Sequence, residues 1–193
     1  MTRRVVAPRV EHDAGADSLQ AALLEDVVDL VHGMQQVEGA VVARPSAVDA
    51  ARRAAWPDMD VLVADTADVA ASLDALHAAG ADEAAIVCAD APDLPPLLLG
   101  KLFSALTSVD AAVCPAENGG LAALAARLPV ADWLREAGLS LDDVDALDRL
   151  RTAAPRRGLN VGSGWHRIRS EADLSELDPG LEGWAATRAW LAR

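Results

Sequence analysis

The chain has 193 residues and a net charge of −13, from 17 Lys and Arg residues against 30 Asp and Glu residues. That length predicts one domain with a sizeable core. The acidity excludes a nucleic-acid or anionic-membrane surface, since either requires clustered positive charge. No apolar stretch reaches the roughly 18 residues of a membrane span, and no signal-peptide pattern opens the chain. We therefore expect a cytoplasmic protein without nucleic-acid or membrane partners.

Helical and strand patterns alternate along the chain, which is typical of an α/β protein. The first helix is expected over residues 16–33, where apolar residues recur at helical spacing up to Gly33. The later elements are expected as strand 40–43, helix 46–56, strand 60–64, helix 66–80, strand 84–89, helix 95–106, strands 109–115 and 121–125, helices 129–137 and 141–151, an interrupted strand 158–169, and helices 171–177 and 181–192. This order predicts a doubly wound, mostly parallel sheet. It forms a single domain over residues 1–193, with residues 178–193 as a C-terminal helical appendage.

The run Ala84–Ala89 contains no charge and is followed by Asp90 and Asp93, with prolines at 92, 95 and 96. A continuous apolar run bounded by turn residues predicts a strand buried on both faces. Ligands of open α/β sheets bind beyond the carboxyl ends of such strands. The pattern therefore places Asp90 and Asp93 where a metal ion or a sugar-phosphate would bind. The alternative is that both aspartates cap the next helix and begin a turn.

A second polar turn follows the apolar strand expected at 109–115. Its residues Glu117, Asn118, Gly119 and Gly120 are expected to line the same cleft as Asp90, because parallel neighbours place their carboxyl ends at one side of the sheet. The alternative is a plain hairpin turn between two strands.

The segments Cys88-Ala-Asp-Ala-Pro-Asp-Leu-Pro95 and Cys114-Pro-Ala-Glu-Asn-Gly-Gly120 together resemble a small bacterial glycosyltransferase-A-like family. This family is catalogued as a domain of unknown function and is often labelled a selenium-domain-associated transferase. Its members carry Asp-x-Pro-x-Leu and then Pro-Ala-x-Asp-Gly-Gly. Phospholactate guanylyltransferase and the molybdenum cofactor guanylyltransferase are more distantly similar. The resemblance covers about residues 15–177 and implies a nucleotide-diphospho-sugar transferase fold that acts on a nucleotide-activated donor.

The resemblance also implies roles for single residues. Asp90 would help to hold Mg²⁺ or Mn²⁺ against the phosphates of a nucleotide or nucleotide-sugar. Asp93 or Glu117 would assist or act as the base. The Gly119-Gly120 turn, which has no Cβ atoms, would let an acceptor approach the backbone closely.

The chain departs from the family pattern at four places, one of which is Ala64-Asp-Thr-Ala-Asp-Val-Ala70 in place of the family's Gln-Gly-x-x-Leu-Gly. Its first residues lack the glycine-containing loop and the Lys-Thr-Arg-Leu that grips phosphates, so Arg3, Arg4 or Arg9 would have to substitute. Asn118 stands where the family has an aspartate. Arg167-Ile-Arg-Ser170 matches the family's Asp-x-Asp-Thr, a second metal-binding position. Guanidinium groups there remove metal ligands and repel the cation, so we expect weak binding of Mg²⁺ or Mn²⁺ and impaired catalysis.

Three functional hypotheses remain open at this point. The first is an active glycosyl or nucleotidyl transferase. The second is a non-catalytic nucleotide- or anion-binding module, in which Arg167 and Arg169 form a salt bridge with Asp90 or bind the substrate's anion. The third is a structural domain that forms a homodimer through its Trp-bearing C-terminal helix at 181–191.

Overall fold

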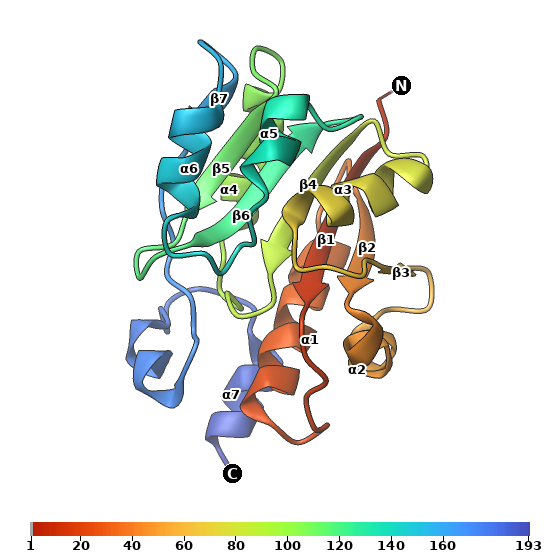
Figure 1. Ribbon diagram of the computed structural model, residues 1–193. Helices are drawn as coiled ribbons and strands as arrows, with labels where there is room; N and C mark the ends of the chain where they lie inside the picture. The colour runs from red at the N-terminus through yellow and green to blue at the C-terminus, as the bar shows by residue number, and fades with distance from the viewer. Residues whose placement is uncertain (1) are drawn as a thin grey trace.

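The computed structural model describes residues 2–193 and contains one seven-stranded sheet (Figure 1). The strand order is β3-β2-β1-β4-β6-β5-β7, and β6 is the strand that runs antiparallel to its neighbours. The strands are β1 (Arg4–Val10), β2 (Glu38–Ala43), β3 (Asp60–Val63), β4 (Glu83–Cys88), β5 (Ala111–Pro115), β6 (Leu121–Arg127) and β7 (Leu159–Val161). The α/β fold class expected from the sequence is confirmed.

Helices lie on both faces of this sheet. In Figure 1, α3 and α5 lie in front of it and α1 passes behind β1. The helices are α1 (Leu19–His32), η1 (Pro45–Ala47), α2 (Val48–Ala54), α3 (Val69–Ala78), α4 (Pro96–Ala105), α5 (Asp132–Ala137), α6 (Ala146–Ala153), η2 (Glu171–Glu176) and α7 (Ala185–Leu191). Within residues 2–193, none of them is long and apolar enough to cross a membrane.

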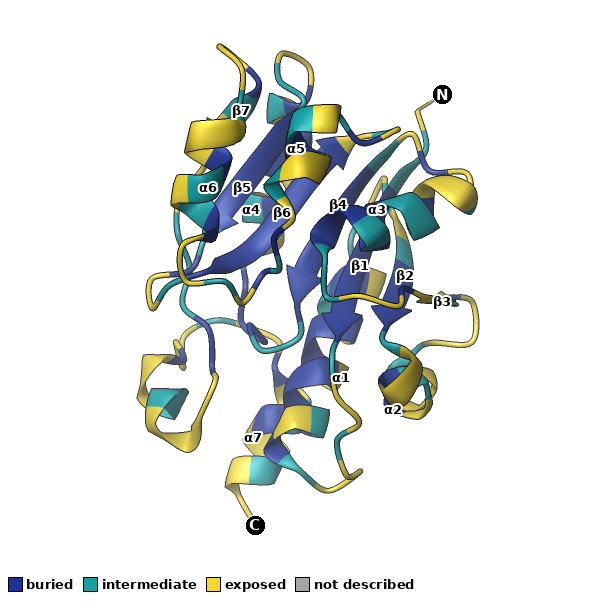
Figure 2. Cartoon of the chain, in the orientation of Figure 1, coloured by how far each residue is buried: buried dark blue, intermediate teal, exposed yellow. Residues whose placement is uncertain are grey.

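The core is centred on the middle strands, which are buried along nearly their whole length (Figure 2). Strand β4 pairs with β1 on one side and β6 on the other, so the strand expected at 84–89 is central as the sequence predicts, with observed bounds Glu83–Cys88. Many of the buried side chains on β4, β5 and β6 are alanines. Small side chains of this kind let the covering helices approach the sheet closely.

Strand β1 is not among the elements expected from the sequence, yet it lies at the centre of the sheet. Pro8 lies within it and has no N–H to donate, which normally argues against a central strand. The structure nevertheless pairs β1 in parallel with β2 and β4. Tertiary pairing on both sides therefore overrides the local signal of the proline.

The C-terminal segment differs most from expectation. The strand expected at 158–169 is wrong beyond Val161, after which a single bridge joins Trp165 to Ala116. The helix expected at 171–177 is a 3₁₀ helix over 171–176, and the one expected at 181–192 begins only at Ala185. Glycines at 162, 164, 180 and 183 and the proline at 179 explain why regular structure is interrupted here.

The appendage at 178–193 packs against α1. The buried carboxylate of Asp26 accepts hydrogen bonds from the backbone N–H groups of Ala186 and Thr187, each at 2.8 Å. A carboxylate on α1 thereby satisfies two free donors at the start of α7. Burial raises the pKa of Asp26 above its ordinary value, although these two N–H groups oppose the shift.

Candidate functional site

A cavity of about 680 Å³ opens beyond the carboxyl ends of β1 and β4. The chain continues from β1 to β2 on one side of this pair and from β4 to β5 on the other side, so these two strands form the switch point of the sheet. Ligands of open α/β sheets bind at such points. The cavity is lined by the loop and helix start after β1, the end of β4, and two later segments: residues 9–15, 18, 20, 23 and 24, residues 88–90, residues 141–142 and residues 167–169.

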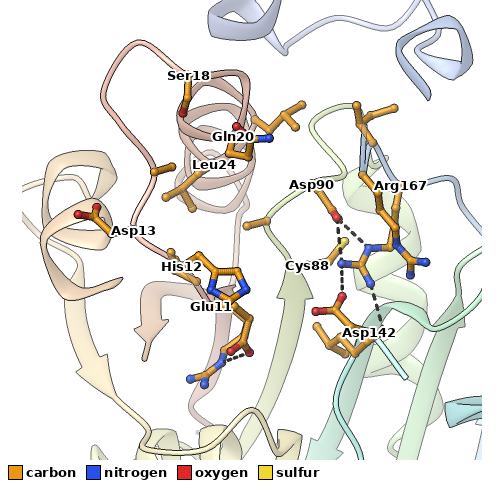
Figure 3. Close-up of a pocket in the computed structure, with 18 of the residues that line it drawn as sticks. Glu11, His12, Asp13, Ser18, Gln20, Leu24, Cys88, Asp90, Asp142 and Arg167 are labelled. Carbon is orange, nitrogen blue, oxygen red and sulfur yellow. Dashed lines mark hydrogen bonds and ion pairs between the residues drawn. The ribbon is translucent and has the colours of Figure 1, made fainter. Parts of the chain in front are cut away.

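Asp90 lies in this cavity, two residues beyond β4, as the sequence predicts. Its backbone carbonyl accepts the N–H of Ile168 at 2.7 Å. Its carboxylate accepts two hydrogen bonds from Arg167, Nε to Oδ1 at 2.7 Å and Nη2 to Oδ2 at 2.9 Å (Figure 3). This bidentate ion pair engages both oxygens of the carboxylate that was expected to hold a metal.

The guanidinium of Arg167 has no donor left for a ligand. Beyond the pair with Asp90, its Nη2 donates to Oδ1 of Asp142 at 2.6 Å, and its Nη1 donates to the carbonyls of Leu141 at 3.1 Å and Leu121 at 3.3 Å. These five contacts use all five N–H groups of the side chain, which is only 6% exposed. Burial alone would lower the pKa of Arg167, but the carboxylates around it outweigh burial and the pKa is raised.

Cys88 lies on the floor of the same cavity and is buried. Burial raises the pKa of its thiol well above the usual value, and the charge of Asp90 adds to the shift. The thiol is therefore protonated at neutral pH and is not an activated nucleophile.

Arg169 is exposed and contacts the turn at 117–120. Its Nη1 donates to the carbonyl of Asn118 at 3.2 Å and its Nη2 to that of Gly119 at 2.6 Å. The side chain of Asn118 in turn donates to the carbonyl of Arg167 at 3.1 Å. The hydrogen bonds of Arg169 leave its Nε free to meet a ligand.

The structure corrects the expectation that this turn lines the cavity directly. Glu117, Asn118, Gly119 and Gly120 are not among the lining residues, although Asn118 and Gly119 form hydrogen bonds with Arg167 and Arg169, which are. Gly120 has a φ of +76°, and a Cβ there would collide with the carbonyl of Leu141. The glycine is thus required by packing beneath the cavity wall.

Asp93 lies outside the cavity lining, and its carboxylate is fully buried. It accepts hydrogen bonds from Nε1 of Trp165 at 3.1 Å, Nε2 of His166 at 2.9 Å and the backbone N–H of Asp178 at 3.1 Å. It neither caps α4 nor faces a ligand site. Its hydrogen bonds hold residues 165–178 against the loop after β4.

The opposite wall comes from the end of β1, the loop after it and the start of α1, and Arg9 is its one residue that the sequence indicates as a ligand. Arg9 pairs with Glu11 at 2.8 Å and also donates to the carbonyl of Thr66, while its Nη1 is buried without a partner. His12 and Gln20 complete this wall (Figure 3). Of the three arginines considered as phosphate ligands, only Arg9 reaches the cavity; Arg3 and Arg4 pair with Glu38 and Glu83 at the other end of the sheet.

The side chains around Asp90 do not fit a divalent cation as they stand. Within residues 2–193, no three His, Cys, Asp or Glu side chains converge as metal ligands. Arg167 lies between Asp90 and Asp142, where its positive charge repels a second cation. Three arginines and four carboxylates line the cavity, which leaves a net charge of −1 with His12 neutral.

Similar folds occur in solved structures of nucleotide-utilising enzymes. A protein assigned as a nucleotide-diphospho-sugar transferase from Desulfovibrio desulfuricans G20 has a TM-score of 0.70 and 15% identity, over 100% of this chain and 96% of that chain. 4-Diphosphocytidyl-2C-methyl-D-erythritol synthase from Anaerococcus prevotii DSM 20548 has a TM-score of 0.64 and 12% identity, over 100% and 97%. CMP:2-keto-3-deoxy-manno-octonic acid synthetase, solved with CTP, has a TM-score of 0.63 and 10% identity, over 90% and 96%. At these identities the likeness shows the fold.

No curated protein sequence matches the chain significantly. A family model does match, over residues 19–140, and its description is "uncharacterized protein conserved in bacteria (DUF2064)". This span holds α1, the central strand β4 and both turns that carry the resemblance seen in the sequence. Because the match covers more than half of its residues, the chain belongs to the bacterial DUF2064 family, with the nucleotide-diphospho-sugar transferase fold.

Proposed function

We propose that this protein binds a nucleotide in the cavity between β1 and β4 without catalysing metal-dependent transfer. The observation that carries the proposal is the bidentate pair of Asp90 and Arg167. The carboxylate expected to hold the metal is occupied by a guanidinium whose own donors are all in use. The cavity itself remains open and large enough for a small organic ligand.

The lining of the cavity favours the nucleoside part of the ligand over a long phosphate chain. Val10, Leu23, Leu24 and Ile168 give much of the wall an apolar character suited to a base or a ribose. The net charge of the lining is negative, and Nε of Arg169 is a free cationic donor at the rim. A single phosphate can be held there, whereas a triphosphate without a metal would be repelled.

Calorimetric titration tests this directly. We expect CMP to bind at least as tightly as CTP when no metal is present. We expect 5 mM MgCl₂ or MnCl₂ (roughly a saturating concentration for ordinary nucleotide–metal sites) to leave the affinity for CMP unchanged within about twofold. The same metals should tighten CTP binding less than tenfold, because they lower the charge of CTP in solution but gain no ligand from the protein. CTP binding that tightens tenfold or more with either metal would refute the proposal. Metal-dependent transfer from a nucleotide-sugar, abolished by Asp90→Asn, would establish the active-transferase hypothesis instead.

A pair of matched variants locates the ligand. Ala14 lines the cavity and is half-buried, while Ala16 lies in the same loop, is exposed and does not line the cavity. Ala14→Trp should fill the cavity and weaken CMP binding at least tenfold, and Ala16→Trp should leave it unchanged. Equal effects of the two variants would place the ligand elsewhere.

A further inference from the structure

Five oxygen atoms surround the guanidinium of Arg167. Two come from the carboxylate of Asp90, one from Asp142, and two from the backbone carbonyls of Leu121 and Leu141. Carboxylate and carbonyl oxygens are the ligands that hard divalent cations, above all Ca²⁺, take in proteins. Here the cation that they surround is part of the chain.

We propose that Arg167 is the resident cation of this site and occupies a cage that accepts a hydrated divalent cation once the guanidinium is removed. The inference concerns the cation alone and stands whether or not a nucleotide is the ligand of the cavity.

The charges of the cage support this assignment. Two carboxylates face one guanidinium, so the cluster has a net charge of −1 with Arg167 and −2 without it. Without the guanidinium the two carboxylates would repel each other, and a cation that enters between them would relieve this repulsion. Because the tether to residue 167 is covalent, the resident cation cannot dissociate or be lost to a chelator.

The geometry determines which cation can replace it. The five oxygens are spaced for a planar ion with N–H donors, so a bare cation would be too small to reach them all. Ca²⁺ tolerates irregular sets of six to eight oxygens and can retain bridging waters, whereas Mg²⁺ demands near-octahedral geometry. Asp142 is 57% exposed and can adjust its position. Ca²⁺ should therefore replace the guanidinium better than Mg²⁺ does.

The experiment compares thermal unfolding of the wild-type chain and of Arg167→Ala as CaCl₂ or MgCl₂ is raised at constant ionic strength. Arg169→Ala is the matched control, because it removes a neighbouring arginine of the same wall that contacts neither carboxylate. Arg167→Ala should melt at a lower temperature than wild type. It should then regain stability with Ca²⁺ in a saturable manner, with an apparent affinity at least tenfold tighter than for either other chain. Adding Asp90→Asn to Arg167→Ala should abolish this gain.

Arg167→Gln provides a second route if the alanine variant does not fold, since its amide can still donate to Asp90. Arg167→Gln should likewise regain stability with Ca²⁺ in a saturable manner. A folded variant of either kind whose response to Ca²⁺ matches that of Arg169→Ala would overturn the proposal. Failure of both variants to fold in any cation would overturn it as well, because no cation would then replace the guanidinium. Equal Ca²⁺ binding by the wild-type chain would show that Arg167 does not occupy the cage.

Discussion

Replacing Asp93 with alanine tests whether this residue is a structural fastening or a ligand-binding group. The substitution leaves three donors without an acceptor: Nε1 of Trp165, Nε2 of His166 and the N–H of Asp178. Each buried donor left unpaired costs about 1–3 kcal/mol. The ring of His166 is not completely buried and can regain water, so we expect a total loss of about 3–5 kcal/mol in the free energy of unfolding.

Urea titration followed by tryptophan fluorescence measures this loss. Glu117→Ala is the control, because its side chain is exposed and lies outside the cavity lining; its effect should stay within about 0.5 kcal/mol. CMP affinity should be measured for both variants under conditions where they are folded. The structure predicts that Asp93→Ala lowers the free energy of unfolding, whereas the folded variant keeps its affinity for CMP. If stability falls by less than about 1 kcal/mol while CMP binding is lost, Asp93 is a ligand group and the reasoning is refuted.

Three further predictions follow from buried groups. Gly120→Ala should lower the free energy of unfolding by at least about 2 kcal/mol in urea titration, because φ is positive there and the new Cβ would collide with Leu141; a neutral effect would contradict the packing described. Burial raises the pKa of Asp26, so the folded chain holds this proton more tightly than the unfolded chain. Wild-type stability should therefore fall as pH rises through the raised pKa, and the difference from Asp26→Asn, measured from acidic to neutral pH, should show that slope. Burial also raises the pKa of the Cys88 thiol strongly and that of Cys114 to about 11, so neither should react with a thiol reagent at pH 7.5 until the chain is unfolded.

The sequence predicts most strands of the sheet, but it predicts neither β1 nor the course of the C-terminal segment. The charge-free run at 84–89 shows a buried strand because its signal is local and continuous, and β4 confirms it. Strand β1 was missed because Pro8 removes a donor and the run is short, so its pairing on both sides is visible only in three dimensions. The path of residues 165–178 is fixed by hydrogen bonds to Asp93 and Asp90, which are distant in sequence, so local patterns do not predict it.

The candidate site, too, is predicted only in part from the sequence. Asp90 was predicted because a strand's end and a ligand position coincide in this class of sheet. The salt bridge with Arg167 was among the alternatives, and the structure shows it. Asp142 is not among the predicted site residues, because the sequence places it in a helix over 141–151 and nothing local reveals that its carboxylate contacts Arg167. The roles of Asp90, Asp93, Glu117 and the glycine turn in binding stay predictions.

The hydrogen bonds that tie residues 167–169 to Asp90 and to the turn at 118–119 have a consequence for how the protein is made. A ribosome would release all of β1 to β7 before it released the residues that complete the cavity wall, and Asp26 would wait still longer for its partners at 186 and 187. A nascent chain can therefore assemble its sheet while the cavity still lacks one wall. Asp90 lacks its partner until residue 167 is made, and Asp26 lacks its partners until residues 186 and 187 are made. A chain cut before residue 167 would form a sheet whose cavity has no wall at 167–169.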